Sequence, residues 1–227
     1  MCGRYSITTP EEALRRLFGF EGPARNLGPR YNIAPRQDVP VIRAEGGVRR
    51  LALLRWGLVP AWAKDPLIGD KLINARAETV AEKPSFKSAF RARRCLVPAD
   101  GFYEWRRDGT LAQPFRIEMR DRSPFALAGL WERWRDGAGE VLETFTLITT
   151  GANATLEPIH HRMPVILAAE HYALWLDASA APERLGALLK PFPAAPLHAY
   201  PIDRKVNSSA NDGPEILMPV EEQRRLI

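Results

Sequence analysis

Apolar positions near the start of the chain recur at helical spacing. Leu14, Leu17 and Phe18 fall on one face of a helix. Thr9 and the Pro-Glu-Glu after it have the sequence of an N-cap, a first-turn proline and a capping box, and Gly19 is a stop signal. This pattern predicts a helix that begins just after Thr9 and ends at Gly19.

Short apolar runs separated by Gly, Pro and Asp dominate residues 38–150 and predict a strand-rich region. The runs are VPVIR, LALLRWGLV, RCLVPADGFYEW, PFRIEM, FALAGLWERW and ETFTLITT. Helical spacing returns in AAEHYALWL and PERLGALLKPF, where Pro182 stands at a helix start and Pro191 forces a stop. Strands and helices outside strict alternation predict an α+β fold, with a mixed-sheet or barrel-like core and peripheral helices.

The chain is expected to form one domain over residues 1–227, because it contains no linker, repeat or low-complexity tract. It also lacks a signal-peptide pattern and any long apolar stretch, which favours a soluble cytoplasmic protein that contacts no membrane. Two cysteines, Cys2 and Cys95, form neither a disulfide framework nor a zinc ligand set. No nucleotide-binding motif is present, so a nucleotide cofactor is not indicated. No metal or organic cofactor is expected, because the candidate chemistry below supplies its own nucleophiles, and the protein is expected to be a monomer.

The charge of the chain adds one weak indication. The net charge is +5, the sequence pI is near 9.5, and arginine dominates the basic residues. Guanidinium groups bind phosphate in a bidentate manner, so this composition is compatible with an anionic partner such as nucleic acid. A bias in genome base composition explains the same arginine content equally well, and both explanations stay open.

Cys2 is the first candidate for chemistry. In C-G-R-Y-S-I a period of two predicts an extended segment with Cys2, Arg4 and Ser6 on the same side. Methionine is usually trimmed before a small second residue, which would expose Cys2 as a 1,2-aminothiol. An α-amine has a pKa of about 7.7–8.0, so it can attack an aldehyde near neutral pH, after which the thiol closes a thiazolidine ring.

Three further segments place polar groups where they could serve a site. Asn74, Arg76 and Glu78 alternate with small residues in LINARAETV, which fits either a ligand-binding face or a solvated strand. Glu104 lies among aromatic residues in PADGFYEW, where desolvation would suit a general acid, although a salt bridge to arginine is an equal alternative.

PIHHRMPVIL is the last of these segments, and it sets two histidines and an arginine between prolines. Adjacent side chains point in different directions, so one of His160 and His161 could be a general base while the other is exposed or structural. Arg162 beside them could hold a phosphate.

Seven motifs in order along nearly the whole chain resemble the SOS response-associated peptidase family. They are M-C-G-R-Y, Y-N-I-A-P, W-G-L-V-P, N-A-R-A-E-T, A-D-G-F-Y-E-W, I-H-H-R-M-P and V-N-S-S-A-N-D-G-P-E-I-L. The resemblance implies a single α+β domain that binds single-stranded DNA and crosslinks to abasic sites through a thiazolidine. It also implies association with the nucleoid when DNA is bound, and no obligatory protein partner.

The same resemblance implies roles for individual residues. Cys2 matches the crosslinking cysteine, and Asn74 matches an asparagine that orients the sugar and the reacting amine. Glu104 matches an acid that promotes opening of the sugar ring, and His160 matches a histidine associated with proton transfer and crosslink reversal. These four residues are the predicted catalytic set.

A second group of matches concerns the DNA contacts. Arg4, Arg76 and Arg162 match phosphate-binding positions, and Trp62 resembles an aromatic residue that stacks at a DNA junction. His161 departs from the family pattern, in which aspartate is frequent, so the charge beside the predicted histidine differs here.

Two other functions stay open at this level. A cysteine or N-terminal-nucleophile hydrolase would use Cys2 as nucleophile, His160 as base and Glu104 as its orienter on an amide. A plain single-strand-binding module would use the basic surface and Trp62 alone. The family name also implies removal of Met1 by self-processing, with an AP-lyase step as a further possibility, although an aminopeptidase would expose the same α-amine.

Overall fold

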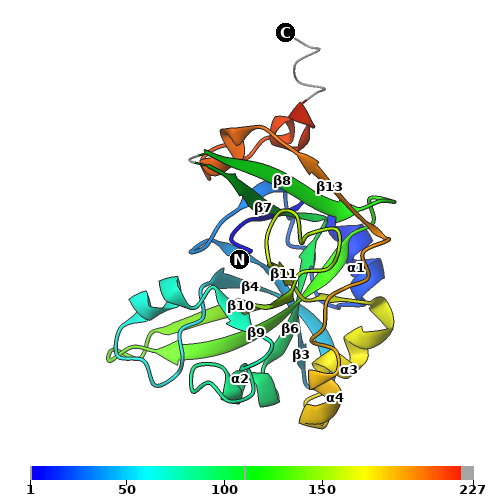
Figure 1. The fold of residues 1–227 in the computed structure, drawn as a ribbon. Coiled ribbons are helices and arrows are strands. Elements are labelled where there is room, and N and C mark those ends of the chain that lie inside the picture. The colour runs from blue at the N-terminus through cyan, green and yellow to red at the C-terminus, as the bar shows by residue number, and fades with distance from the viewer. Residues whose placement is uncertain (1, 110, 221–227) are drawn as a thin grey trace.

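The computed structural model describes residues 2–109 and 111–220. Two β-sheets stack along the long direction of the molecule, with the helices at the periphery (Figure 1). The fold is α+β and strand-rich, as predicted from the apolar runs, and the strand-rich region expected over residues 38–150 is confirmed.

The lower sheet closes into a barrel of five strands. Its strands are β3 (Asp38–Glu45), β4 (Val48–Trp56), β6 (Arg94–Ala99), β9 (Phe125–Arg135) and β10 (Val141–Gly151). They pair in the ring β10-β4-β3-β6-β9 and back to β10, and the β4–β10 pair is parallel whereas the other four are antiparallel. The sheet is therefore mixed, and the barrel-like core predicted from the sequence is confirmed.

Short strands extend the barrel beyond one end of β10. β5 (Asn74–Arg76) runs parallel to β10, and β11 (Arg162–Pro164) runs antiparallel to it. β12 (Ile166–Leu167) pairs with β9. Thr149 of β10 is opposite Arg76 on one side and Pro164 on the other, so β10 brings two distant segments together.

The upper sheet has five antiparallel strands in the order β13-β8-β7-β1-β2. Its strands are β1 (Tyr5–Ile7), β2 (Arg30–Ile33), β7 (Gly101–Asp108), β8 (Leu111–Met119) and β13 (Leu197–Pro201). Tyr5 is opposite both Ile33 of β2 and Phe102 of β7, so the start of the chain is an interior strand. This position fixes Cys2 within the molecule.

One hydrophobic cluster joins the two sheets. Tyr5 of the upper sheet meets Trp56 of the barrel with ring centroids 5.3 Å apart, and Trp56 stacks on Phe145 at 6.2 Å. All three side chains are at most 1% exposed. Burial of aromatic rings of this size contributes a large share of the hydrophobic free energy of folding.

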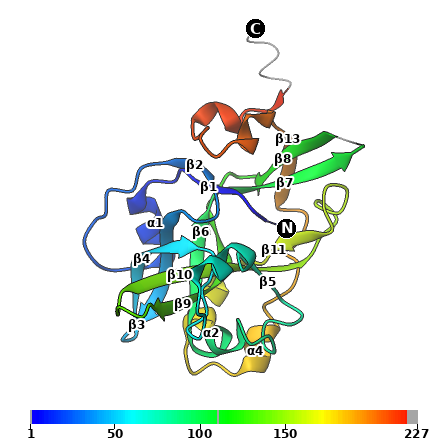
Figure 2. The ribbon, with the colours of Figure 1, turned by 90° about the vertical axis from the view of Figure 1, so that its left-hand side faces the viewer.

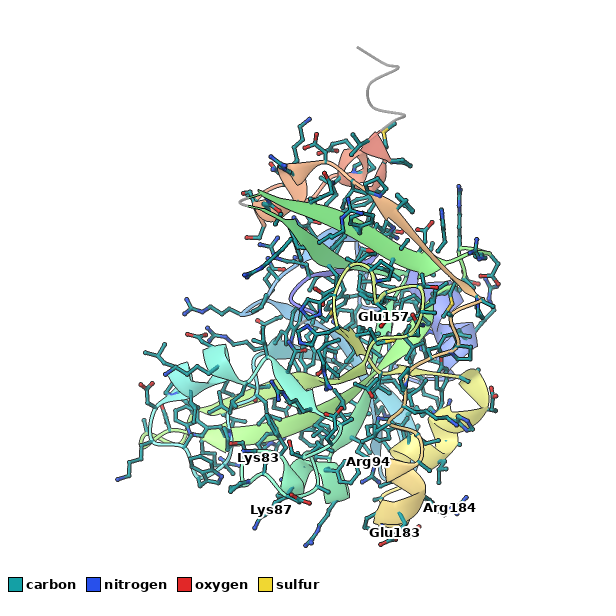
Figure 3. The ribbon with its side chains drawn as sticks, in the orientation of Figure 1. Lys83, Lys87, Arg94, Glu157, Glu183 and Arg184 are labelled. Carbon is teal, nitrogen blue, oxygen red and sulfur yellow. The ribbon has the colours of Figure 1, made fainter. Side chains whose placement is uncertain are left out.

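The helices are short and lie outside the sheets. They are α1 (Glu11–Phe18), α2 (Lys87–Ala92), α3 (Tyr172–Leu176) and α4 (Pro182–Gly186), with 3₁₀ turns at Pro66–Lys71, Ala169–His171, Arg204–Asn207 and Pro214–Leu217. Figure 3 shows Lys83 and Lys87 beside α2 and Glu183 and Arg184 on α4, at the end of the barrel away from the upper sheet. Among the described residues, no helix has the length and apolar character needed to cross a membrane.

Two details of the helix predictions were wrong. The predicted cap at Thr9 is not formed, because Pro10 occupies the N-cap position of α1 and no side chain caps the helix. Gly19 does end α1 in the left-handed conformation, with φ of 63°. α4 begins at Pro182 as expected but ends at Gly186, so Pro191 does not terminate it.

A close glycine contact positions the loop that leads into β5. Gly57 has φ of 125°, and a Cβ atom there would lie 2.8 Å from the carbonyl oxygen of Gly69. A Cβ on Gly69 would lie 2.6 Å from the carbonyl oxygen of Gly57. Only glycine permits this approach. The contact holds the loop that contains Trp62 against the end of β4 and so positions the start of β5 at Asn74.

Candidate functional site

Four elements converge between the two sheets. The N-terminal segment runs from β1 toward β11, beside β7 and β5 (Figure 2). Of the predicted residues, Cys2 is linked to Asn74 by a hydrogen bond and to Glu104 by an electrostatic interaction, while His160 precedes β11 at the same end of β10. Asn74 and Glu104, which lie 72 and 102 positions after Cys2 in the chain, thus both interact with Cys2.

Cys2 is held by its backbone as well as by burial. The Asn74 side-chain Nδ2 donates a hydrogen bond of 2.8 Å to the carbonyl oxygen of Cys2. The thiol Sγ lies 3.8 Å from the carbonyl oxygen of Arg4, and that oxygen also accepts the backbone N–H of Tyr103 at 3.0 Å. Cys2 is 0% exposed, so its side chain is fully enclosed by the protein.

Burial sets the protonation state of the thiol. Desolvation raises the pKa of Cys2 well above its ordinary value, and the nearby Glu104 carboxylate raises it further. A thiolate would be a buried negative charge beside another acid, which is unfavourable. The resting side chain is therefore a neutral thiol. Cys95, the second free cysteine, is also buried, within the barrel.

Asn74 belongs to β5, which pairs in parallel with β10 through Leu147. The predicted alternation holds over this strand, since Ala75 is fully buried whereas Arg76 is exposed. The Asn74 amide donates to Cys2, but its Oδ1 is buried and has no hydrogen-bond partner among the described residues. A buried carbonyl oxygen of this kind is suited to accept a hydrogen bond from a substrate hydroxyl or amine.

Glu104 lies in the middle of β7 and is 2% exposed. Desolvation by burial raises the pKa of its carboxyl group. A dominant ion pair with arginine would instead lower the pKa, so the structure favours the desolvated-acid interpretation over the salt bridge that the sequence left open. A raised pKa favours the protonated carboxyl group, which can donate a proton.

His160 is partly buried and is fixed by the loop before β11. Its backbone N–H donates to the carbonyl of Leu156 at 2.9 Å, and its ring Nδ1 accepts the backbone N–H of Arg162 at 3.0 Å. Burial lowers the pKa of the imidazole. The ring of His161 stacks on it with centroids 4.4 Å apart.

The predicted DNA-contacting arginines differ in how the protein already engages them. Arg162 forms a two-point ion pair with Glu78, with distances of 2.6 and 3.0 Å, and also donates to the carbonyl of Thr149. Arg4 donates to three oxygens of the protein, described below. Arg76 is exposed, and Trp62 is 59% exposed in the loop that leads to β5.

Part of the arginine content is structural. Arg116 is 3% exposed and pairs with Glu118 and Asp100 inside the upper sheet. Arg94, labelled in Figure 3, donates to backbone carbonyls including those of Phe90 and Trp175. These guanidinium groups explain some of the basic composition without any anionic partner.

A hydrogen-bonded clamp behind the site was not predicted. The Asn32 side chain accepts from Arg4 at 2.9 Å and donates to the carbonyls of Val206, Ser208 and Asn211. Arg4 donates to the carbonyls of Val206 at 2.8 Å and Asn207 at 3.0 Å.

Asp212 completes this clamp by accepting the backbone N–H groups of Tyr31 and Asn32. Asn32 and Asp212 lie in the Y-N-I-A-P and V-N-S-S-A-N-D motifs, to which the sequence assigned no role. Their positions within these motifs were the only indication in the sequence that the two residues matter. The contacts bind the segment after Asp203 to β2 and to the N-terminal segment that carries Cys2 and Arg4.

Among residues 2–109 and 111–220, no three His, Cys, Asp or Glu side chains are grouped to hold a metal ion. The arrangement offers a nucleophile, a buried acid, an imidazole and an orienting amide. This set can perform addition to a carbonyl carbon with proton transfer.

The chain is similar to several known proteins. The family profile described as SOS response associated peptidase matches residues 1–209. Abasic site processing protein YoqW of Bacillus subtilis is 43% identical over 221 residues, covering 96% of this chain and 99% of that protein. Abasic site processing protein HMCES of Xenopus tropicalis is 31% identical over 264 residues, covering 97% of this chain and 78% of that protein.

A solved structure shares the whole fold. The crystal structure of a protein from Bacteroides thetaiotaomicron superposes with a TM-score of 0.88 and 31% sequence identity, covering 96% of this chain and 100% of that one. The match of a family profile over most of the chain, together with these relatives, identifies the family. The chain belongs to the SOS response associated peptidase family.

Proposed function

We propose that this protein processes abasic sites in single-stranded DNA by forming a covalent thiazolidine with Cys2. The observation that carries the proposal is the joint placement of Cys2, Asn74 and Glu104: the amide holds the Cys2 backbone, and a buried acid lies near the thiol. Relatives named abasic site processing proteins support DNA with abasic sites as the substrate.

The proposed thiazolidine-forming reaction needs no cofactor. An abasic sugar opens its ring to an aldehyde, and the α-amine of Cys2 adds to the aldehyde carbon with loss of one water to give an imine. The Cys2 thiol then adds across the C=N bond, with sulfur bonding to carbon and the proton going to nitrogen. Overall, one C–N and one C–S bond form and one water leaves.

This reaction requires a free α-amine on Cys2. Met1 lies outside the described residues, so its removal is a part of the proposal that mass measurement must address. Self-processing and trimming by an aminopeptidase give the same mature residue. An AP-lyase outcome would begin from the same imine.

Each remaining group has one proposed role. Glu104 donates a proton to the sugar ring oxygen as the ring opens, which its raised pKa suits. Asn74 orients the sugar and the amine through its amide, whose Oδ1 is available for a substrate donor. His160 transfers protons at the sugar.

The test is the intact mass of the protein after incubation with a single-stranded oligonucleotide that carries one abasic site. We expect an adduct equal to protein lacking Met1 plus the oligonucleotide minus one water. The same oligonucleotide with an intact base is the control and gives no adduct. Protein that lacks Met1 but yields no adduct would refute the proposal.

Replacing Arg76 by alanine is expected to weaken binding to intact and abasic single strands alike. Arg76 is exposed on β5 next to the site, and a phosphate contact positions a strand without reading its bases. Loss of one such contact lowers the slope of log affinity against log salt by about 0.7. Fluorescence anisotropy across a salt series measures this slope.

Arg184→Ala is the matched control, because Arg184 is an exposed arginine on α4, at the opposite end of the barrel (Figure 3). Equal affinity of the Arg76→Ala variant and the native protein at low salt would remove Arg76 from the DNA interface. Arg162→Ala is expected to weaken binding as well, although it also releases Glu78 from its ion pair.

A further inference from the structure

His161 lies beside the site and has no role in the chemistry above. Its ring stacks on His160 with centroids 4.4 Å apart and an angle of 24° between the planes. Its carbonyl accepts the backbone N–H of Ala152 at 3.1 Å, so the loop is tied to the end of β10. His160 is partly buried whereas His161 is exposed to solvent.

The backbone of Arg162 fixes the ring of His160 through Nδ1. The Arg162 N–H lies 3.0 Å from Nδ1 and the Arg162 carbonyl oxygen lies 3.2 Å from it, so a bare Nδ1 accepts from the N–H and a protonated Nδ1 donates to the carbonyl. The loop therefore holds the ring in place in either protonation state. Burial, the largest influence, lowers the pKa of the imidazole and favours the neutral ring.

We propose that His161 is a positioning residue that fixes the ring of His160 by stacking and keeps it neutral by repelling a second positive charge. Two stacked imidazolium rings at this separation would place like charges within contact distance, which is unfavourable. Protonation of one ring therefore disfavours protonation of the other, and the two rings titrate as a coupled pair.

The charged groups that face His161 act in the same direction. His160, Arg162 and Arg76 all lower the pKa of His161, His160 most strongly. Glu104 on β7 is the acid among these neighbours, and the charge of His161 in turn favours its ionised form. The imidazole of His161 thus links the protonation of His160 to that of Glu104.

A carboxylate at position 161 should reverse this effect. Replacing His161 by aspartate would put an opposite charge beside His160, and such a partner raises a histidine pKa by about one to three pH units. Replacing His161 by phenylalanine keeps a stacked ring but removes the charge, so a smaller rise is expected. The pKa of His160 should therefore be highest in His161→Asp, intermediate in His161→Phe and lowest in the native protein. This order separates the effect of charge from that of stacking.

The direct test is an NMR titration of the histidine ring protons in the protein without DNA. The chain has four histidines, so the His160 resonance can be followed in each variant. His198→Phe is the control, since the ring of His198 contacts that of Tyr200, with centroids 5.3 Å apart, and not the His160–His161 pair. A His160 pKa in His161→Asp that equals the native value would overturn the inference, whether or not the protein crosslinks DNA.

The kinetic consequence rests on the proposed function. If neutral His160 is the active form, the acid limb of crosslinking rate against pH moves to higher pH in His161→Asp and less so in His161→Phe. Failure of the native protein to crosslink would refute the proposed function and leave the NMR result to decide this inference. A native protein that crosslinks, with the same profile in all variants, would overturn the role of His161 alone.

Discussion

Cys2→Ser is expected to abolish the heat-stable adduct with abasic DNA. A hydroxyl group is a far weaker nucleophile than a thiol toward an imine, so the five-membered ring does not close. The α-amine is still present in this variant, and a transient imine should therefore form and be trapped by borohydride. Denaturing gel electrophoresis with and without borohydride distinguishes the two products.

Cys95→Ser provides the matched control for this experiment. Cys95 is a free thiol that is also fully buried, but it lies in β6 within the barrel. Crosslinking by this variant should equal that of the native protein. A heat-stable adduct of undiminished yield from Cys2→Ser would show that another group makes the covalent bond.

Glu104→Gln should slow crosslinking by roughly 10²- to 10⁴-fold while leaving DNA affinity nearly unchanged. The amide keeps the shape and polarity of the side chain but cannot deliver a proton to the sugar oxygen. The loss should therefore appear in the single-turnover rate and not in equilibrium binding. Glu157→Gln is the control, because Glu157 is exposed on the loop between β10 and β11 (Figure 3).

The pH profile gives this prediction a second, independent measure. Because burial raises the pKa of Glu104, its protonated form persists to higher pH, and acid catalysis is lost as pH rises through that pKa. The α-amine of Cys2 must lose its proton over the range near pH 8, so the native profile should be bell-shaped. A Glu104→Gln variant that crosslinks at the native rate would remove Glu104 from the mechanism.

Local features of the fold could be predicted from the sequence because they depend on local patterns. Leu14 and Phe18 mark the buried face of α1, and the left-handed conformation at Gly19 ends it. The apolar runs of the middle region report burial on a strand, and strands are found there. The Thr9 cap failed because Pro10 occupies the cap position itself.

Pairings between distant segments could not be predicted in this way. A period-two pattern shows which residues of a strand are buried but not which other strand lies beside it. The parallel β4–β10 pair, which helps to close the barrel, therefore could not be predicted from the pattern. The ion pair of Arg162 with Glu78, 84 positions apart, likewise cannot be predicted from the local sequence pattern. The motif resemblance grouped Cys2, Asn74 and Glu104, but their burial and the resulting pKa shifts required the fold.

The clamp on Arg4 has a consequence for the order in which the site assembles during synthesis. Cys2 leaves the ribosome first, yet Asn74, Tyr103 and finally Val206 and Asn207 must emerge before every contact to its segment can form. Such long-range closure is slow compared with local folding. A nascent chain therefore cannot complete the contacts of the segment that carries Cys2 until translation is nearly finished. A messenger RNA truncated before the codon of Val206 would yield a product in which Arg4 lacks both of these carbonyl acceptors.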